Sequence, residues 1–204
     1  MHKEILNSDQ LGLLPLVAMF RREFYLVGGT AIALYLGHRR SIDFDLFKFA
    51  PLNQKSILKK LSDYKAEYLI TRRVHEQMNV TIKNVKFTFF EYPFEIEANC
   101  NFEKTIKLPD LLTLAAMKAY ALGRRSKWKD YVDLYYIIKD YYSITEIALK
   151  AKTIYKDMFS EKLMRAQISY FNDIDYSEPV EYLQTSVSID EVKSFLIEKA
   201  VDIF

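Results

Sequence analysis

The sequence predicts a mixed α+β fold, with a small mixed β-sheet in the amino-terminal part and a helical carboxyl-terminal part. Two observations support this prediction. Short segments with strand-like alternation of apolar residues are interleaved with amphipathic segments as far as residue 91. From Leu108 onward, apolar residues recur almost throughout at helical spacing. We therefore divide the 204 residues into an α/β core, residues 1–107, and a helical part, residues 108–204.

The predicted elements of the first part are a helix, a strand, a turn, a helix, a strand, a helix and three strands. Their expected ranges are 8–22, 24–27, 28–29, 30–36, 42–47, 54–64, 68–73, 78–82 and 85–91. Lys83-Asn84 lies between the last two strands and suits a two-residue hairpin turn. In the second part, Pro109-Asp110 opens a helix that extends to about residue 122, and another helix is expected over residues 128–142. Further helices follow from residue 144, around a polar break at 172–179.

The charge balance limits how this chain can contact nucleic acid. Lys and Arg number 29 against 27 Asp and Glu, a net charge of +2, so any such contact must come from a local patch. The basic clusters are Arg21-Arg22, Arg39-Arg40, Arg72-Arg73 and residues 124–129. Clusters of this kind most often only face solvent. Only the run 124–129 also contains an aromatic residue, which makes it the strongest of these candidates for contact with a phosphate backbone.

The cysteine content and one apolar run bear on location. The single cysteine, Cys100, excludes an internal disulfide and suits a reducing compartment. The apolar run 11–20 is similar to a signal-peptide core, but charged residues flank it and no small-residue cleavage site follows. It is also too short to span a bilayer. We therefore expect a first core helix at this position, no membrane segment and a cytoplasmic protein.

Asp43 and Asp45 form the first candidate site. The stretch 41–47 alternates as a strand does, so Ile42, Phe44 and Leu46 are expected on one face and both carboxylates on the other. Neighbouring carboxylates repel one another unless a cation lies between them, and Mg²⁺ prefers such hard oxygen ligands. The same pattern also occurs on strands without a catalytic role.

Gly28-Gly29-Thr30 lies upstream, where a predicted strand passes into a helix. Paired glycines let the backbone approach a triphosphate closely, and the first N–H groups of a helix can bind phosphate. Thr30 can cap that helix. An ordinary strand-to-helix turn would have the same residues. The glycine turn together with Asp43 and Asp45 is stronger evidence than either feature alone. A nucleotide donor needs both backbone groups that bind its phosphates and carboxylates that bind its metal ion.

Two neighbouring residues, His38 and Arg39, precede the predicted strand that carries Asp43 and Asp45. Arg39 is a candidate clamp for a phosphate of the nucleotide, with a solvated loop as the alternative interpretation. His38 is less suited to act as a general base, because a histidine in a loop is more often a capping or surface group. We leave it out of the predicted chemistry.

A second candidate set lies on the two predicted helices after residue 108. Lys118 falls on the apolar face of the helix predicted to end near residue 122. Asp130 and Asp133 lie on the apolar face of the helix predicted over residues 128–142, near its amino-terminal end. Because unpaired buried charges are costly, these residues should pair with one another or face a polar cleft. A structural bridge from Lys118 to one aspartate is one interpretation. In the other, Lys118 reaches the donor phosphates while an aspartate holds it or activates the acceptor hydroxyl.

Two motifs together resemble the AbiEii/AbiGii-type nucleotidyltransferase toxin family. The stretch 25–47, which contains Val-Gly-Gly-Thr and Ser-Ile-Asp-Phe-Asp-Leu, resembles the opening motif of that family. The stretch 114–134, with Lys118 followed by Lys129-Asp130-Tyr-Val-Asp133-Leu134, is similar to its second signature. Residues 170–173 are similar to a segment of its shorter members. The resemblance covers nearly the whole chain.

The resemblance implies a polymerase-β-like nucleotidyltransferase core that uses a nucleoside triphosphate donor and Mg²⁺, with Mn²⁺ as a possible substitute. We expect transfer of NMP to an acceptor hydroxyl on RNA, with tRNA suggested by the MenT branch of the family. The implied partner is a separately encoded antitoxin of a type IV-like toxin–antitoxin or phage-defence system. The implied residue roles are phosphate binding by Gly28, Gly29 and Thr30, metal binding by Asp43 and Asp45, and completion of the site by Lys118 with Asp130 or Asp133.

The chain departs from the family pattern at Thr88. Relatives commonly carry an aspartate there, and strand alternation puts the nearby Glu91 on the opposite face. Either two acids suffice, with Asp130 or Asp133 as base, or activity is reduced. The alternatives are therefore a catalytically weak relative that binds nucleotide or a partner protein, and a transferase acting on a protein or small-molecule hydroxyl. Antitoxin-type DNA binding lacks a recognition-helix pattern.

Overall fold

The computed structural model describes residues 1–122 and 124–202, and the chain forms two compact units. Unit 1 contains Met1–Tyr35 and Ser41–Asp110, and unit 2 contains Leu36–Arg40 together with the residues from Leu111 onward. The short segment Leu36–Arg40 therefore packs with helices that follow it by more than seventy residues. The predicted division at residue 107 placed this segment in the α/β core, whereas in the structure it belongs to unit 2. Across the described ranges, no helix combines the length and apolar character needed to cross a membrane.

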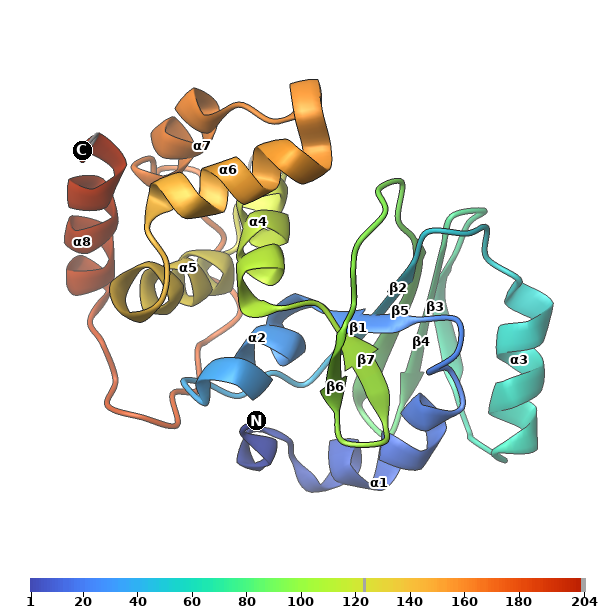
Figure 1. Ribbon diagram of the computed structural model, residues 1–204. Helices are drawn as coiled ribbons and strands as arrows, with labels where there is room; N and C mark the ends of the chain where they lie inside the picture. Colours follow the sequence, from blue (N-terminus) through green and yellow to red (C-terminus); the bar gives the residue numbers. More distant parts are fainter. Residues whose placement is uncertain (123, 203–204) are drawn as a thin grey trace. The chain divides into compact units, whose positions relative to one another are not determined.

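Unit 1 is built on a mixed sheet, which confirms the predicted fold class. In the described residues its seven strands follow the order β3-β4-β5-β2-β1-β7-β6 (Figure 1). β1 is antiparallel to β2 and parallel to β7, and β2 is parallel to β5. The strands are β1 Tyr25–Val27, β2 Phe44–Lys48, β3 Leu69–Arg73, β4 Gln77–Ile82, β5 Val85–Glu91, β6 Cys100–Phe102 and β7 Ile106–Leu108. The helical elements are η1 Lys3–Ile5, α1 Ser8–Ala18, α2 Gly28–Leu36 and α3 Gln54–Asp63.

One face of this sheet carries the core of unit 1. Phe44 and Leu46 of β2 are fully buried, as are the alternate residues of β4 and β5. Phe20, just after α1, packs on Phe89 with ring centroids 4.8 Å apart, and Lys60 of α3 lies over the Phe20 ring. The even-numbered residues of β2 therefore face α1 and α3, and its odd-numbered residues, including Asp45, point to the opposite face.

Most of the predicted elements are confirmed, and the exceptions have local causes. The Lys83-Asn84 turn is present, with positive φ at both residues as a tight hairpin requires. The strand predicted over residues 42–47 begins only at Phe44, and Ile42, which was expected on its apolar face, is 47 % exposed. α1 ends at Ala18 rather than near residue 22. Strands β6 and β7 are missing from the prediction, since three residues are too few to show alternation.

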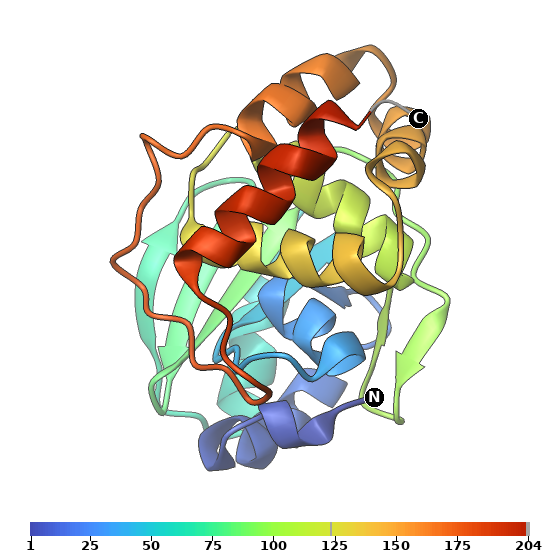
Figure 2. The same cartoon turned by 90° about the vertical axis from the view of Figure 1, so that its left-hand side faces the viewer.

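Unit 2 is helical, as predicted. Its elements are α4 Leu111–Leu122, α5 Trp128–Asp140, α6 Ile144–Tyr155, η2 Lys156–Met158, α7 Glu161–Ile168 and α8 Ile189–Val201. α4 contacts α6, and α8 lies alongside α7, as Figure 2 shows. Residues 169–188 connect α7 to α8 and hold the segment Leu36–Arg40. The backbone N–H of Leu183 donates to His38, and that of Arg40 donates to Glu181.

Candidate active site

Gly28 lies directly beside Asp45, which is one of the two predicted metal ligands. Val27, the last residue of β1, pairs with Asp45 of β2, and α2 begins at the next residue, Gly28. Gly28 has φ +73°, a conformation that favours glycine. A Cβ atom at this position would lie 2.1 Å from Oδ2 of Asp45. Only glycine therefore allows the helix to begin directly beside the carboxylate.

Thr30 ties the start of α2 to the residues that precede β2. Its side chain is buried, and its hydroxyl donates a short hydrogen bond to the backbone carbonyl of Asp43. The hydroxyl of Ser41 lies 3.0 Å away, where it can donate to the Thr30 oxygen. Gln10 of α1 donates to the Ser41 carbonyl at 2.8 Å. These bonds fix the backbone at Asp43, so the observed contacts give Thr30 a positioning role, while its predicted contact with phosphate stays a prediction.

Asp43 and Asp45 are suited to a magnesium ion that takes some of its oxygen ligands from the protein and the others from the substrate. The two residues lie two positions apart at the entry to β2, and both are partly exposed. Mg²⁺ is commonly bound by one or two carboxylates plus substrate phosphates. Within residues 1–122 and 124–202, no group of three or more acidic, histidine or cysteine side chains is placed to hold a metal. The two aspartates therefore offer a pair of oxygen ligands rather than a complete cage.

Thr88 occupies the sheet position next to Asp45. The parallel register of β2 and β5 pairs Asp45 with Thr88, and β4 continues the row with Asn79. Paired residues point to the same face of a sheet, so a carboxylate at position 88 would lie beside Asp45. Both Thr88 and Asn79 are buried. The row thus has neutral polar side chains where the family pattern commonly has a third acid.

In unit 2, Lys118 is buried between two carboxylates. Its Nζ lies 2.7 Å from Asp130 and 2.9 Å from Asp133, and these three side chains are at most 4 % exposed. The predicted pairing of Lys118 with these aspartates is therefore confirmed. Arg125 also binds Asp130, at 2.9 Å, from a position that is half exposed. The proposed roles of Lys118, Asp130 and Asp133 in phosphate binding and proton transfer stay predictions.

Asp133 also binds the segment between α2 and β2. Arg39 makes a bidentate contact with it, with Nε and one terminal nitrogen each 2.8 Å from a carboxylate oxygen. Nε2 of His38 lies 2.8 Å from Asp133 as well. The other terminal nitrogen of Arg39 donates to the Arg40 carbonyl. Each nitrogen of the Arg39 guanidinium thus has an acceptor within unit 2, and its predicted role as a phosphate clamp stays a prediction.

The electrostatics of this cluster favour fixed charges. Burial alone would raise the pKa of Asp133, but Arg39, Lys118 and the His38 hydrogen bond lower it well below its usual value. Burial opposes the charged forms of Arg39 and Lys118, yet the aspartates raise the pKa of both. Burial lowers the pKa of His38 by more than Asp133 raises it. The lowered pKa of His38 favours its neutral form, which can donate the Nε2 proton to ionised Asp133.

Sequence reasoning missed the partners of His38 and Arg39. These residues lie 95 and 94 positions from Asp133, a separation that no periodic pattern links. One signal in the sequence was available. Two buried aspartates carry two negative charges and Lys118 only one positive charge, so a second buried cation was to be expected. The neighbouring Arg39-Arg40 pair was a candidate for that cation.

The chain is similar to solved structures, which include a nucleotidyltransferase toxin, and to one further protein sequence. MenT4, a nucleotidyltransferase toxin from Mycobacterium tuberculosis, matches with a TM-score of 0.61 at 13 % identity, over 94 % of this chain and 81 % of that chain. JHP933 from Helicobacter pylori matches with a TM-score of 0.57 at 17 % identity, over 96 % and 91 % of the two chains. An uncharacterized protein of Aquifex aeolicus is 29 % identical over 157 residues, which are 74 % of this chain and 75 % of that protein.

The chain has the fold of a solved nucleotidyltransferase toxin, and its Asp-x-Asp pair lies beside the glycine turn that opens α2. The family is also identified from the sequence. The model described as "Nucleotidyl transferase AbiEii toxin, Type IV TA system" matches residues 17–201, so the chain belongs to the AbiEii family of nucleotidyltransferase toxins.

Proposed function

We propose that this nucleotidyltransferase is magnesium-dependent and transfers NMP from an NTP to a hydroxyl group of RNA, with tRNA as the expected acceptor. The observation that supports the proposal is the contact of Gly28 with Asp45, which brings the first N–H groups of α2 close to a carboxylate that we propose binds the metal. A nucleoside triphosphate needs both features, since its phosphates bind backbone donors and a divalent cation.

In the proposed reaction, a hydroxyl oxygen of the acceptor attacks the α-phosphorus of the NTP. The bond from that phosphorus to the bridging oxygen breaks, pyrophosphate leaves, and the hydroxyl proton passes to water. The first N–H groups of α2, at Gly28, Gly29 and Thr30, are proposed to bind the triphosphate. Mg²⁺ held by Asp43 and Asp45 would neutralise the phosphate charge, and Mn²⁺ is expected to substitute for it.

The proposed role of the buried cluster in unit 2 is to position the chain that enters β2. Asp133 holds His38 and Arg39, which precede Asp43 by five and four residues. Lys118 in turn keeps Asp133 ionised. The membership in a toxin family leads us to propose a separately encoded antitoxin, and action in the cytoplasm, where NTP and tRNA are available.

The test is transfer of labelled NMP from each of the four NTPs to total tRNA, with Mg²⁺, Mn²⁺ or EDTA. The metal supplies several kcal/mol of charge stabilisation, so Asp43→Asn and Asp45→Asn should each lower kcat by about a hundredfold or more. Asp63→Asn, on the exposed end of α3, is the matched control and should keep wild-type activity. Transfer that persists in EDTA, or in both site variants, would contradict the proposal.

A second candidate function is favoured by Thr88 alone. With two carboxylates in place of the usual three, the protein would bind an NTP and metal but turn over slowly. The same assay separates the two functions. Saturable NTP binding with no transfer to tRNA, protein or small-molecule pools would support the binding function and reject the enzyme.

A further inference from the structure

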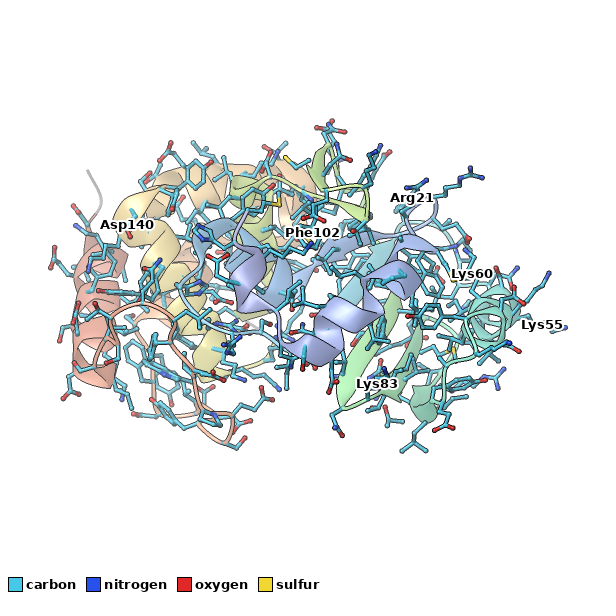
Figure 3. The ribbon with its side chains drawn as sticks, turned by 90° about the horizontal axis from the view of Figure 1, so that it is seen from below. Arg21, Lys55, Lys60, Lys83, Phe102 and Asp140 are labelled. Atoms are coloured by element: carbon cyan, nitrogen blue, oxygen red, sulfur yellow. The ribbon has the colours of Figure 1, made fainter. Side chains whose placement is uncertain are left out.

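A basic cavity lies in unit 1, separate from the two aspartates. It has a volume of about 610 Å³ and is formed by the segment after α1 and by the β6–β7 hairpin. Arg21 and Arg22 line one side, Lys104 and Lys107 line the other, and Tyr25 lies between them. The two sides are joined, because Arg21 donates to the Lys104 carbonyl at 2.9 Å and Tyr25 of β1 pairs with Lys107 of β7. Figure 3 shows Arg21 at the periphery of this unit.

The charges around this cavity are not balanced locally. The two acids in its wall are bound by lysines outside the wall: Glu23 pairs with Lys60 at 2.5 Å, and Glu103 pairs with Lys3 at 3.0 Å. In contrast, among the described residues the side chains of Arg22, Lys104 and Lys107 make no ion pair or hydrogen bond. The cavity therefore presents several cations without a counter-charge, which favours an anionic ligand.

The hydroxyl group of Tyr25 is a buried donor that the fold leaves without a partner in the described ranges. Burial, with a smaller effect of Tyr92, raises the pKa of Tyr25, so the phenol stays protonated. A buried hydroxyl without a hydrogen bond is energetically unfavourable, because it has lost its bonds to water. An acceptor atom of a ligand in the cavity would recover that cost, and phosphate oxygens are strong acceptors.

The register of the sheet relates Tyr25 to the aspartates. Tyr25 pairs with Phe47, while Val27 pairs with Asp45. Residues two apart on a strand point to the same face, so Tyr25 shares the face of Asp45 and lies about 7 Å along the strand from it. Phe47 also pairs with Phe90, with ring centroids 5.1 Å apart, and both rings are partly exposed. A row of aromatic residues thus lies next to the row that contains Asp45.

The combination of aromatic faces and unpaired cations is the one that single-stranded nucleic acids bind. The basic run 124–129 is a weaker candidate than its sequence suggests. Arg125 is bound by Asp130, and Lys127 and Lys129 are both bound by Glu178. Three cations of the run thus contact a carboxylate, whereas Arg22, Lys104 and Lys107 of the cavity have no such partner among the described residues.

We propose that the basic cavity binds a phosphodiester of the acceptor RNA strand, through Arg22, Lys104, Lys107 and the Tyr25 hydroxyl. This proposal rests on RNA being the acceptor of the proposed reaction. In this arrangement the strand passes from the cavity over the aromatic row of Tyr25, Phe47 and Phe90 to the row of Asp45. The cavity would supply affinity without base specificity, since phosphate contacts carry no sequence information.

The test compares the double variant Arg22→Ala, Lys107→Ala with the control Lys55→Ala, Lys59→Ala, which removes the same charge from the exposed face of α3. We expect the KM for tRNA to rise about tenfold in the first variant, with the KM for NTP unchanged in both. The dependence of log Kd on log salt for a single-stranded RNA should become shallower by about 1 for the first variant only. A rise in the NTP KM, or identical behaviour of the two double variants, would overturn the proposal.

Tyr25→Phe separates a ligand-binding role from a structural one. Removing an unpartnered buried hydroxyl should leave stability unchanged or improve it, while RNA affinity should fall severalfold. Loss of stability with unchanged RNA affinity would mean that the hydroxyl serves the fold. RNA binding is measured by fluorescence anisotropy on Asp45→Asn, in which turnover is expected to be slow, and without added NTP. An enzyme that binds RNA in the cavity but transfers nothing to it would reject the proposed function and keep this inference, so the two failures are distinguishable.

Discussion

Gly28 approaches Asp45 so closely that a methyl group on its Cα would lie 2.1 Å from a carboxylate oxygen. We expect Gly28→Ala to displace this carboxylate and lower kcat/KM by about a hundredfold, because ångström-scale misplacement of a catalytic group has effects of that size. The positive φ adds about 1–2 kcal/mol of backbone strain, which should lower the Tm. Steady-state kinetics and thermal denaturation measure the two effects.

Gly12→Ala is the matched control. Gly12 lies in α1, and a Cβ at that position meets no atom within 4 Å. The substitution should keep wild-type kinetics and raise stability by as much as about 1 kcal/mol, since alanine favours helix more than glycine does. Wild-type kcat/KM in Gly28→Ala would show that the contact with Asp45 is not required.

Thr88→Asp should add a third carboxylate to the candidate site of Asp43 and Asp45, at the sheet position next to Asp45. Because Thr88 and Asp45 are paired in register, the new carboxylate would repel Asp45 without metal and bind a shared cation with it. We expect roughly tenfold tighter Mn²⁺ binding, about 1.4 kcal/mol, and lower stability in EDTA than the wild type. Titration calorimetry and denaturation with and without metal test this.

Thr88→Asn is the uncharged control and should leave Mn²⁺ affinity unchanged. If the aspartate and asparagine variants bind Mn²⁺ equally well, position 88 does not face the metal. If the aspartate variant also raises kcat, the threonine limits the rate of the natural enzyme. An unchanged kcat alongside tighter metal binding would indicate that two carboxylates suffice for turnover.

Asp133→Asn should be strongly destabilising. It leaves buried Arg39 and Lys118 with less compensating charge, and breaking a buried pair from one side costs about 3–5 kcal/mol. Arg125→Ala removes a cation that is 51 % exposed, so we expect a loss of about 1 kcal/mol or less. Urea denaturation measures both. Equal losses would contradict the assignment of Asp133 as the centre of the cluster.

The same variants test the positioning role. If Asp133 acts through Arg39 on the chain that leads to Asp43, Arg39→Lys should lower kcat, because lysine cannot reproduce the bidentate contact. The KM for NTP should change little. A large rise in that KM would instead support the original prediction that Arg39 clamps a phosphate of the nucleotide.

The sequence was informative wherever a function depends on local spacing. The turn at Gly28, the Asp43 and Asp45 pair, and the burial of Lys118 all follow from periods of two or of 3.6 residues. The contact of Arg39 with Asp133 and the cavity around Tyr25 join segments far apart in sequence, whose pairing depends on tertiary packing. The predicted start of the strand at Ile42 was wrong: β2 begins at Phe44, and the carbonyl of Asp43 accepts a hydrogen bond from the Thr30 side chain.

His38 gives the fold a pH dependence with a defined sign. Burial lowers its pKa in the folded protein, so below the unfolded pKa of about 6.5 the unfolded chain binds the extra proton. The stability associated with neutral His38 is therefore complete above about pH 6.5 and is lost as pH falls toward the folded pKa. The pKa of Asp133 is lowered well below its usual range, so the loss it causes begins only near pH 4.

His38→Gln keeps an N–H donor for Asp133 but does not titrate. Between pH 7 and 5, the free energy of unfolding of the wild type should fall relative to this variant by as much as about 1.4 kcal/mol per pH unit. The exposed His2 is common to both proteins and cancels in the difference. Parallel curves would mean that His38 has the same pKa folded and unfolded. A wild type that gains stability on acidification would mean that His38 is protonated and forms an ion pair with Asp133, because only a raised pKa makes the folded state bind the additional proton.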